Sequence, residues 1–143
     1  MQRRNPLKIA VDTSFILTVI LKRKDTQKAE SLLRMAAGKY SEVYLPSQVI
    51  AEVAYVLEGI HKYSSINKLS KLEIKGIIEG ILNTPKVKCK DENLVRKALD
   101  FYVKKNIPFG DAIIVSDVIE NGINEILTFD RDFERIVGMG GSS

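Results

Sequence analysis

Short apolar runs alternate with longer amphipathic stretches along this chain, and this alternation constrains its fold more than any other feature. Strand-like runs lie at residues 7–11, 43–45, 87–90 and 126–129. Stretches with helical spacing lie between and after them, at residues 15–21, 26–37, 47–57, 74–81, 94–103, 112–119 and 133–137. Short strands that alternate with helices are typical of an α/β fold with a mostly parallel sheet.

The length and composition exclude several other classes of protein. With 143 residues, 45% of them hydrophobic, the chain suits one domain with its own core. We expect that domain to span residues 1–137, followed by a disordered tail at 138–143. A single cysteine excludes a disulfide scaffold and a thiolate zinc cluster. No apolar run approaches the roughly 20 residues of a membrane-spanning helix, and no signal peptide is recognisable. We therefore expect a cytoplasmic protein without a membrane partner.

Charge is distributed unevenly along the chain. The net charge is +4, but residues 62–105 hold eleven Lys or Arg against five acids, whereas residues 106–143 hold two against seven. A basic middle region is suited to a polyanionic partner such as RNA. Within it, Lys68, Lys71 and Lys75 recur on one predicted helix face. This face is either simply solvated or follows an RNA phosphate backbone.

Acidic residues stand where the predicted strands and helices meet. Asp12 and Asp130 each end a strand-like run, Asp111 opens a helix, and Glu52 flanks the apolar stripe of another helix. Each has a structural alternative when taken alone: a turn for Asp12, a helix cap for Asp111, a solvated turn for Asp130 with Asp132, and a buried ion pair for Glu52.

Taken together, the four acids predict a metal site. The carboxyl ends of parallel strands meet at one edge of the sheet, where ligands bind. Carboxylates that converge there repel one another unless a cation joins them. Because the set offers oxygen ligands without His or Cys, Mg²⁺ or Mn²⁺ is the expected ion. Such a site can activate water for attack on a phosphate ester.

At these acids the chain resembles the PIN domain family of metal-dependent ribonucleases, in particular its small single-domain members of the VapC toxin type. The matching segments are Val11-Asp12-Thr13-Ser14, Glu52 with its helix, Phe109-Gly110-Asp111-Ala112, and Thr128-Phe129-Asp130-Arg131-Asp132-Phe133. Each segment is short, but their order and spacing agree with the family along nearly the whole chain.

The resemblance implies a three-layer α/β/α sandwich with a short, mostly parallel sheet. It also implies that Asp12, Glu52, Asp111 and Asp130 form an acidic quartet, with Asp132 as the alternative fourth acid. Ser14 and Thr128 would support the quartet by positioning a ligand, a water or an acid near the metal.

The function expected from the resemblance is Mg²⁺- or Mn²⁺-dependent endoribonuclease activity on single-stranded RNA, with metal-activated water as the nucleophile. Many small members are homodimeric toxins held by an antitoxin protein, and others process ribosomal RNA; both roles stay open. Asp130-x-Asp132 also resembles the motif of haloacid-dehalogenase-like phosphatases, but that pair normally follows the first strand. The main alternative is a non-catalytic α/β module that binds RNA or a protein and holds a structural cation.

The remaining candidates have structural interpretations. His61 is expected at the surface, and Cys89 is expected to be a small buried hydrophobe rather than a reactive thiol. Four aromatic residues fall on apolar faces and are predicted to belong to the core: Phe15, Tyr44, Tyr55 and Phe101.

Overall fold

A computed structural model describes residues 7–17, 31, 34–35, 38–59 and 68–128. The chain divides into two compact units, Met1–Glu92 and Asn93–Ser143, and each is described by itself. None of the helices within the described ranges is long and apolar enough to cross a membrane. The predicted tail at 138–143 and most of the helix predicted at 26–37 lie outside these ranges. A single domain over 1–137 remains a prediction.

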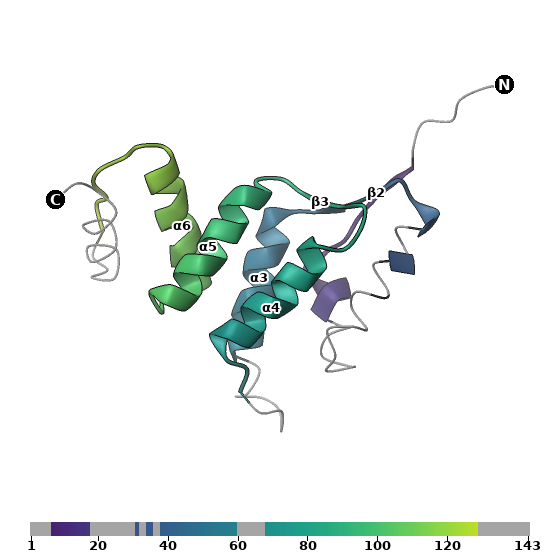
Figure 1. The fold of residues 1–143 in the computed structure, drawn as a ribbon, viewed down its shortest axis with the longest axis horizontal. Helices are drawn as coiled ribbons and strands as arrows, with labels where there is room; N and C mark the ends of the chain where they lie inside the picture. Colours follow the sequence, from purple (N-terminus) through teal and green to yellow (C-terminus); the bar gives the residue numbers. More distant parts are fainter. Residues whose placement is uncertain (1–6, 18–30, 32–33, 36–37, 60–67, 129–143) are drawn as a thin grey trace. The chain divides into compact units, whose positions relative to one another are not determined.

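The first unit is built on a three-stranded parallel sheet (Figure 1). Its strands are β1 (Lys8–Ala10), β2 (Glu42–Leu45) and β3 (Val87–Cys89), in the order β1-β2-β3. Ile9 pairs with Val43, and Val43 pairs with Val87. The N–H of Val11 continues the pairing beyond β1 by donating to the carbonyl oxygen of Tyr44 over 3.0 Å. The predicted α/β class and parallel sheet are confirmed.

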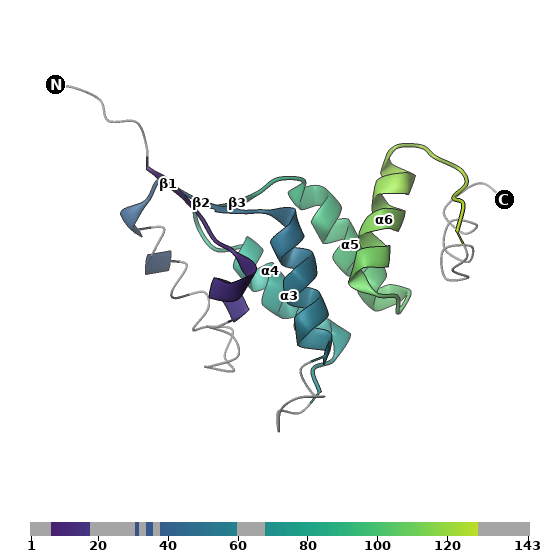
Figure 2. The ribbon, with the colours of Figure 1, turned by 180° about the vertical axis from the view of Figure 1, so that it is seen from behind.

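Two amphipathic helices join β2 to β3. These are α3 (Ser47–Gly59) and α4 (Lys71–Leu82), which pack against each other (Figures 1 and 2). Helix α4 begins with a capping box: the N–H of Glu73 donates to the Ser70 hydroxyl, and the N–H of Ser70 donates to the Glu73 carboxylate. This reciprocal bonding fixes the start of α4 and lowers the pKa of Glu73, because two hydrogen bonds from Ser70 stabilise its charged form.

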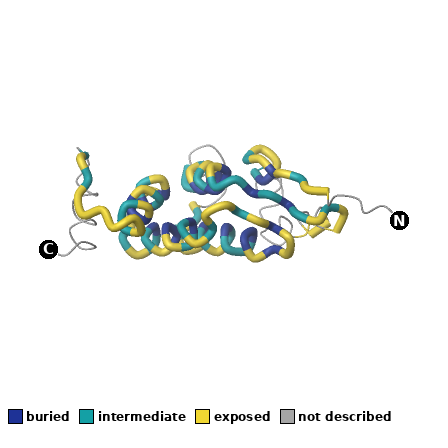
Figure 3. Tube along the Cα trace, turned by 90° about the horizontal axis from the view of Figure 1, so that it is seen from above, coloured by how far each residue is buried: buried dark blue, intermediate teal, exposed yellow. Residues whose placement is uncertain are grey.

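The core of the first unit lies between the sheet and these helices. Every second residue of β2 is buried, and the buried positions of α3 and α4 recur at intervals of one turn (Figure 3). The side chains that fill this core are aliphatic: Val43, Leu45, Val49, Ile50, Val53, Ala54, Leu57, Ile74, Ile78, Ile81 and Leu82.

The second unit contains a helical hairpin. Helix α5 (Glu92–Lys104), whose first residue ends the first unit, is followed by α6 (Phe109–Glu120). The rings of Tyr102 and Phe109 meet edge to face with their centroids 5.6 Å apart, and Lys97 Nζ lies 2.7 Å from Glu120 Oε1. These two contacts, one apolar and one ionic, hold the helices of the hairpin together.

Two expectations about the apolar segments are wrong. Residues 126–128 form no strand, although the sequence predicts one at 126–129; they find no pairing partner within the described ranges, and Phe129 lies outside them. Tyr55 is 79% exposed and Phe15 41% exposed, although the sequence predicts both to be core residues. Tyr44 and Phe101 are half-buried.

Helix α4 offers a test of the core. Ile78 is fully buried, whereas Leu72 on the same helix is 65% exposed. We expect Ile78→Ala to lower the free energy of unfolding by about 2–5 kcal/mol, because it leaves a cavity among side chains that cannot fully collapse. Leu72→Ala, the matched control, should change it by less than about 0.5 kcal/mol. Urea denaturation of both variants measures the difference, and equal effects would contradict the packing of α4.

Candidate metal centre

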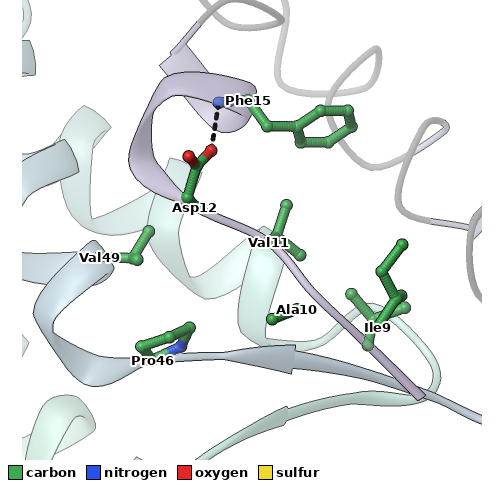
Figure 4. Close-up of a pocket in the computed structure, with 8 residues that line it drawn as sticks. Ile9, Ala10, Val11, Asp12, Phe15, Pro46 and Val49 are labelled. Atoms are coloured by element: carbon green, nitrogen blue, oxygen red, sulfur yellow. Dashed lines mark hydrogen bonds between the residues drawn. The ribbon is translucent and has the colours of Figure 1, made fainter.

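Asp12 follows directly after β1, at the carboxyl edge of the sheet, and caps the helical turn formed by residues 13–17. Its Oδ1 accepts a hydrogen bond from the N–H of Phe15 over 3.0 Å (Figure 4). It accepts another from the hydroxyl of Ser14 over 2.9 Å. The sequence offered a turn as the structural role of Asp12, and in the structure this residue is the cap of the helical turn. The predicted metal ligand is therefore also a helix cap, so the two interpretations of Asp12 are compatible.

The same hydrogen bonds stabilise the ionised form of Asp12. They lower the pKa of its carboxyl group, with the Phe15 N–H as the largest cause and the Ser14 hydroxyl as the next. Asp12 thus remains ionised at pH values where an ordinary aspartate begins to take up a proton. An oriented, ionised carboxylate is the form that binds a metal ion.

Glu52 approaches the same edge of the sheet from α3. Because α3 begins two residues after β2 ends, its first turns lie beside the carboxyl ends of the strands. The hydroxyl of Thr13 donates to Glu52 Oε2 over 3.1 Å, so the residue next to Asp12 holds the Glu52 carboxylate. The structure thereby brings together Asp12 and Glu52, two of the four predicted acids.

The exposure of Glu52 corrects the sequence analysis. The sequence places Glu52 beside the buried stripe of its helix, but its side chain is exposed. Successive helix residues are rotated by about 100°, so positions 48, 52 and 55 lie opposite the buried stripe. Glu52 therefore avoids the desolvation cost of a buried carboxylate and needs no buried basic partner.

A pocket of about 400 Å³ opens beside Asp12 (Figure 4). Its walls come from β1, β2, the turn after β1 and the start of α3. Asp12 is the single charged residue among the described residues of its lining, which are Ile9, Ala10, Val11, Asp12, Phe15, Val43, Pro46 and Val49. The candidate site therefore combines an acidic rim with an apolar wall.

The other predicted site residues belong to the second unit, to α4 and the segment just before it, or to residues outside the described ranges. Asp111 lies half-buried in the first turn of α6, and Thr128 is half-buried at the end of the described chain; both belong to the second unit. Asp130 and Asp132 lie outside the described residues. Lys71 and Lys75 are half-buried on α4, and Lys68 is exposed just before that helix.

The donor chemistry of the site suits a hard cation, although a complete ligand set is not found. No group of three or more His, Cys, Asp or Glu residues in the described ranges could hold a metal ion. Asp12, Glu52 and the neighbouring hydroxyls offer oxygen donors only, which is the set that Mg²⁺ and Mn²⁺ prefer. Mg²⁺ commonly binds through one or two carboxylates and keeps several waters, so these residues fit part of such a site.

Two residues were assigned minor roles by the sequence analysis. Cys89 is half-buried, and burial followed by the charges of Glu92 and Asp91 raises its pKa to about 11. Its thiol therefore stays protonated at neutral pH, as expected for a structural cysteine. Thr13 was named only as part of a matching segment, and its contact with Glu52 was missed, because no local sequence pattern indicates a bond between residues so far apart in the chain.

Comparison with known proteins identifies the class to which this fold and site belong. The PIN domain family model matches residues 9–139, and the chain belongs to that family. It is also similar to a protein named VapC ribonuclease from Aquifex aeolicus (strain VF5). The two are 25% identical over 127 residues, which cover 88% of this chain and 90% of the relative.

The bond between Ser14 and Asp12 can be tested by titration. We expect Ser14→Ala to raise the pKa of Asp12 toward the ordinary aspartate value, because the variant cannot donate a hydrogen bond to the carboxylate. Since the folded-state pKa is depressed, the stability contributed by this carboxylate is present at neutral pH and is lost as the pH falls through that pKa. In the variant this loss should begin at a higher pH.

Carboxyl-detected NMR measures the pKa, and acid unfolding measures the stability. Ser41→Ala is the matched control, because the Ser41 hydroxyl donates to the Leu7 carbonyl at the opposite edge of the sheet. If Asp12 has the same pKa in both variants, the Ser14 hydroxyl does not stabilise the Asp12 carboxylate, and Ser14 has no role in the site.

Proposed function

We propose that this protein is a Mg²⁺- or Mn²⁺-dependent endoribonuclease that cleaves single-stranded RNA. The observation that carries the proposal is the ionised carboxylate of Asp12 at the carboxyl edge of the sheet, with Glu52 held beside it by Thr13. Membership of the PIN domain family and the likeness to a VapC ribonuclease support the same activity.

The proposed roles of the residues follow from their chemistry. Asp12, Asp111 and Asp130 would hold the cation together with Glu52, and Asp132 is the alternative to Asp130. When bound, the cation neutralises phosphate charge and activates water for hydrolysis of the phosphodiester. Ser14 and the Phe15 N–H keep the Asp12 carboxylate ionised and oriented, and Thr13 orients Glu52. Thr128 would position a ligand or water.

The biological role proposed here is that of a toxin. The relative's name, VapC ribonuclease, favours this role over ribosomal RNA processing, and it suggests an antitoxin protein as a partner. A closed homodimer is proposed as the assembly, since two-fold pairs are the commonest oligomers. The cytoplasm, where RNA is abundant, is the proposed compartment.

Cleavage in the presence of chosen metals tests the activity. A single-stranded RNA oligonucleotide should be cut with Mg²⁺ or Mn²⁺ and should remain intact in EDTA. Zn²⁺ alone should not replace them, because the site lacks imidazole and thiolate ligands. Asp12→Asn should abolish cleavage while it preserves the fold, since asparagine caps a helix about as well as aspartate.

Thermal unfolding separates the metal site from the fold. Mn²⁺ should raise the Tm of the wild type, because the ion binds only the folded state, and should raise that of Asp12→Asn clearly less. Asp117→Asn, an exposed carboxylate on α6 outside the predicted acids, should behave like the wild type. Metal-dependent stability without cleavage would favour a non-catalytic module with a structural cation. A full metal response in Asp12→Asn would contradict the ligand assignment.

The lysines of α4 are proposed to bind RNA phosphates. Replacement of Lys71 and Lys75 by Ala should weaken binding to all RNA sequences. It should also flatten the dependence of log K on log salt by about 0.7 for each phosphate of a single strand that the variant no longer neutralises. Lys97→Ala is the control, because Lys97 lies on α5, outside the proposed phosphate-binding surface. An unchanged slope in the double variant would place the phosphate-binding surface elsewhere.

A further inference from the structure

Tyr55 occupies an unusual position on α3. Its side chain is 79% exposed, and it lies on the side of the helix opposite the buried stripe. Glu52 precedes it by three residues on that same side. Three residues of α-helix advance about 4.5 Å along the axis, so an exposed aromatic ring stands one turn from the Glu52 carboxylate.

Tyr55 lies near the candidate metal site, because Glu52 and Thr13 connect its helix to Asp12. Thr13 joins Glu52 to the turn that Asp12 caps, so Tyr55, Glu52 and Asp12 follow one another along a continuous edge of the first unit. A polynucleotide whose phosphate lies at the two acids places its neighbouring nucleotide within reach of the next turn of α3. The group that reaches Tyr55 should be uncharged, since Glu52 repels a second phosphate.

We propose that Tyr55 is a stacking platform for a nucleobase that flanks the scissile phosphate of single-stranded RNA. The inference rests on the proposed ribonuclease function and names the residue that recognises the unpaired substrate. A stacked base needs one accessible ring, and stacking tolerates all four bases because each has a π-face. A base inside a duplex is already stacked on its neighbours and cannot take this position.

The surroundings of Tyr55 favour a base over a protein partner. One turn from Tyr55 on the helix lie two carboxylates, Glu52 and Glu58, and two small residues, Ala51 and Gly59, and Gln48 lies two turns before it on the same side. Protein interfaces have cores of contiguous apolar surface, usually several hundred square ångströms in area. A single ring beside charged and amide side chains matches the pattern of single-strand binding sites, in which aromatic residues stand along a polar groove.

Two substitutions of Tyr55 distinguish the effect of the aromatic ring from the effect of a large apolar side chain. Tyr55→Leu keeps an apolar side chain but removes the ring, whereas Tyr55→Phe keeps the ring. Tyr40→Leu is the matched control, because Tyr40 precedes β2 at the opposite edge of the sheet from Asp12. All three variants should fold with Tm values close to that of the wild type.

Two readouts are used for each variant. The first is the KM and kcat for cleavage of a single-stranded RNA oligonucleotide. The second is the fluorescence of 2-aminopurine, placed in turn at each position of the same oligonucleotide and bound in EDTA, which prevents cleavage. Stacking on the ring should quench 2-aminopurine at one position.

We expect Tyr55→Leu to raise KM and the dissociation constant roughly 5- to 150-fold, the range that corresponds to one base–aromatic stack, with a smaller effect on kcat. Quenching should disappear in Tyr55→Leu and persist in Tyr55→Phe and Tyr40→Leu.

The contrary outcomes are distinct. Equal KM and equal quenching in Tyr55→Leu and the wild type would overturn the stacking role while leaving the ribonuclease function intact. A change of oligomeric state in Tyr55→Leu, seen by sedimentation, with unchanged quenching would place Tyr55 at an interface between copies and would also overturn it. If the wild type cleaves no RNA in Mg²⁺ or Mn²⁺, the proposed function fails, and the 2-aminopurine signal still decides whether Tyr55 stacks on a base.

Discussion

The parallel pairing of β1 with β2 is the constraint on which the candidate site depends. In a parallel pair the chain leaves both strands at the same edge, so the turn after β1 and the first turns of α3 become neighbours. Asp12 stands in that turn, and Glu52 stands on that helix. The hydrogen bond from Thr13 to Glu52 joins residues 39 positions apart and follows directly from this pairing. An antiparallel pairing would have placed the two carboxylates at opposite edges.

Helix α3 serves the core and the site at the same time. Its aliphatic stripe packs against the sheet and α4, and the positions opposite that stripe carry Glu52 and Tyr55. Because the helical period links the two sides, burial of the stripe determines which residues face solvent at the acidic edge. Because α3 is packed against the core, Glu52 and Tyr55, which are proposed to bind the metal and the RNA, project from a fixed helix.

The sequence predicted the positions of helices and strands more accurately than the burial and pairing of individual residues. The runs at β1, β2 and β3 and the helices from α3 to α6 were anticipated from short apolar runs and from longer helical stretches bounded by turn signals. Asp12 was recognised as a candidate ligand from its position at the end of a strand, and Glu52 from its position beside the apolar stripe of its helix. Tyr55 was assigned to the core because it is a large aromatic residue in an apolar segment, although it lies opposite the buried stripe of α3. Residues 126–128 were apolar enough for a strand, yet a strand also requires a partner for its backbone groups.

The sequence by itself determined the α/β class, and it placed Asp12 in the turn after β1. These depend on interactions between residues close together in the chain, such as the bonds from Ser14 and Phe15 to Asp12. Only the tertiary structure decided that β1 pairs with β2 in parallel, that Thr13 holds Glu52, and that Tyr55 faces solvent. Local periodicity specifies which residues share a side of a helix, but long-range packing determines which side is covered.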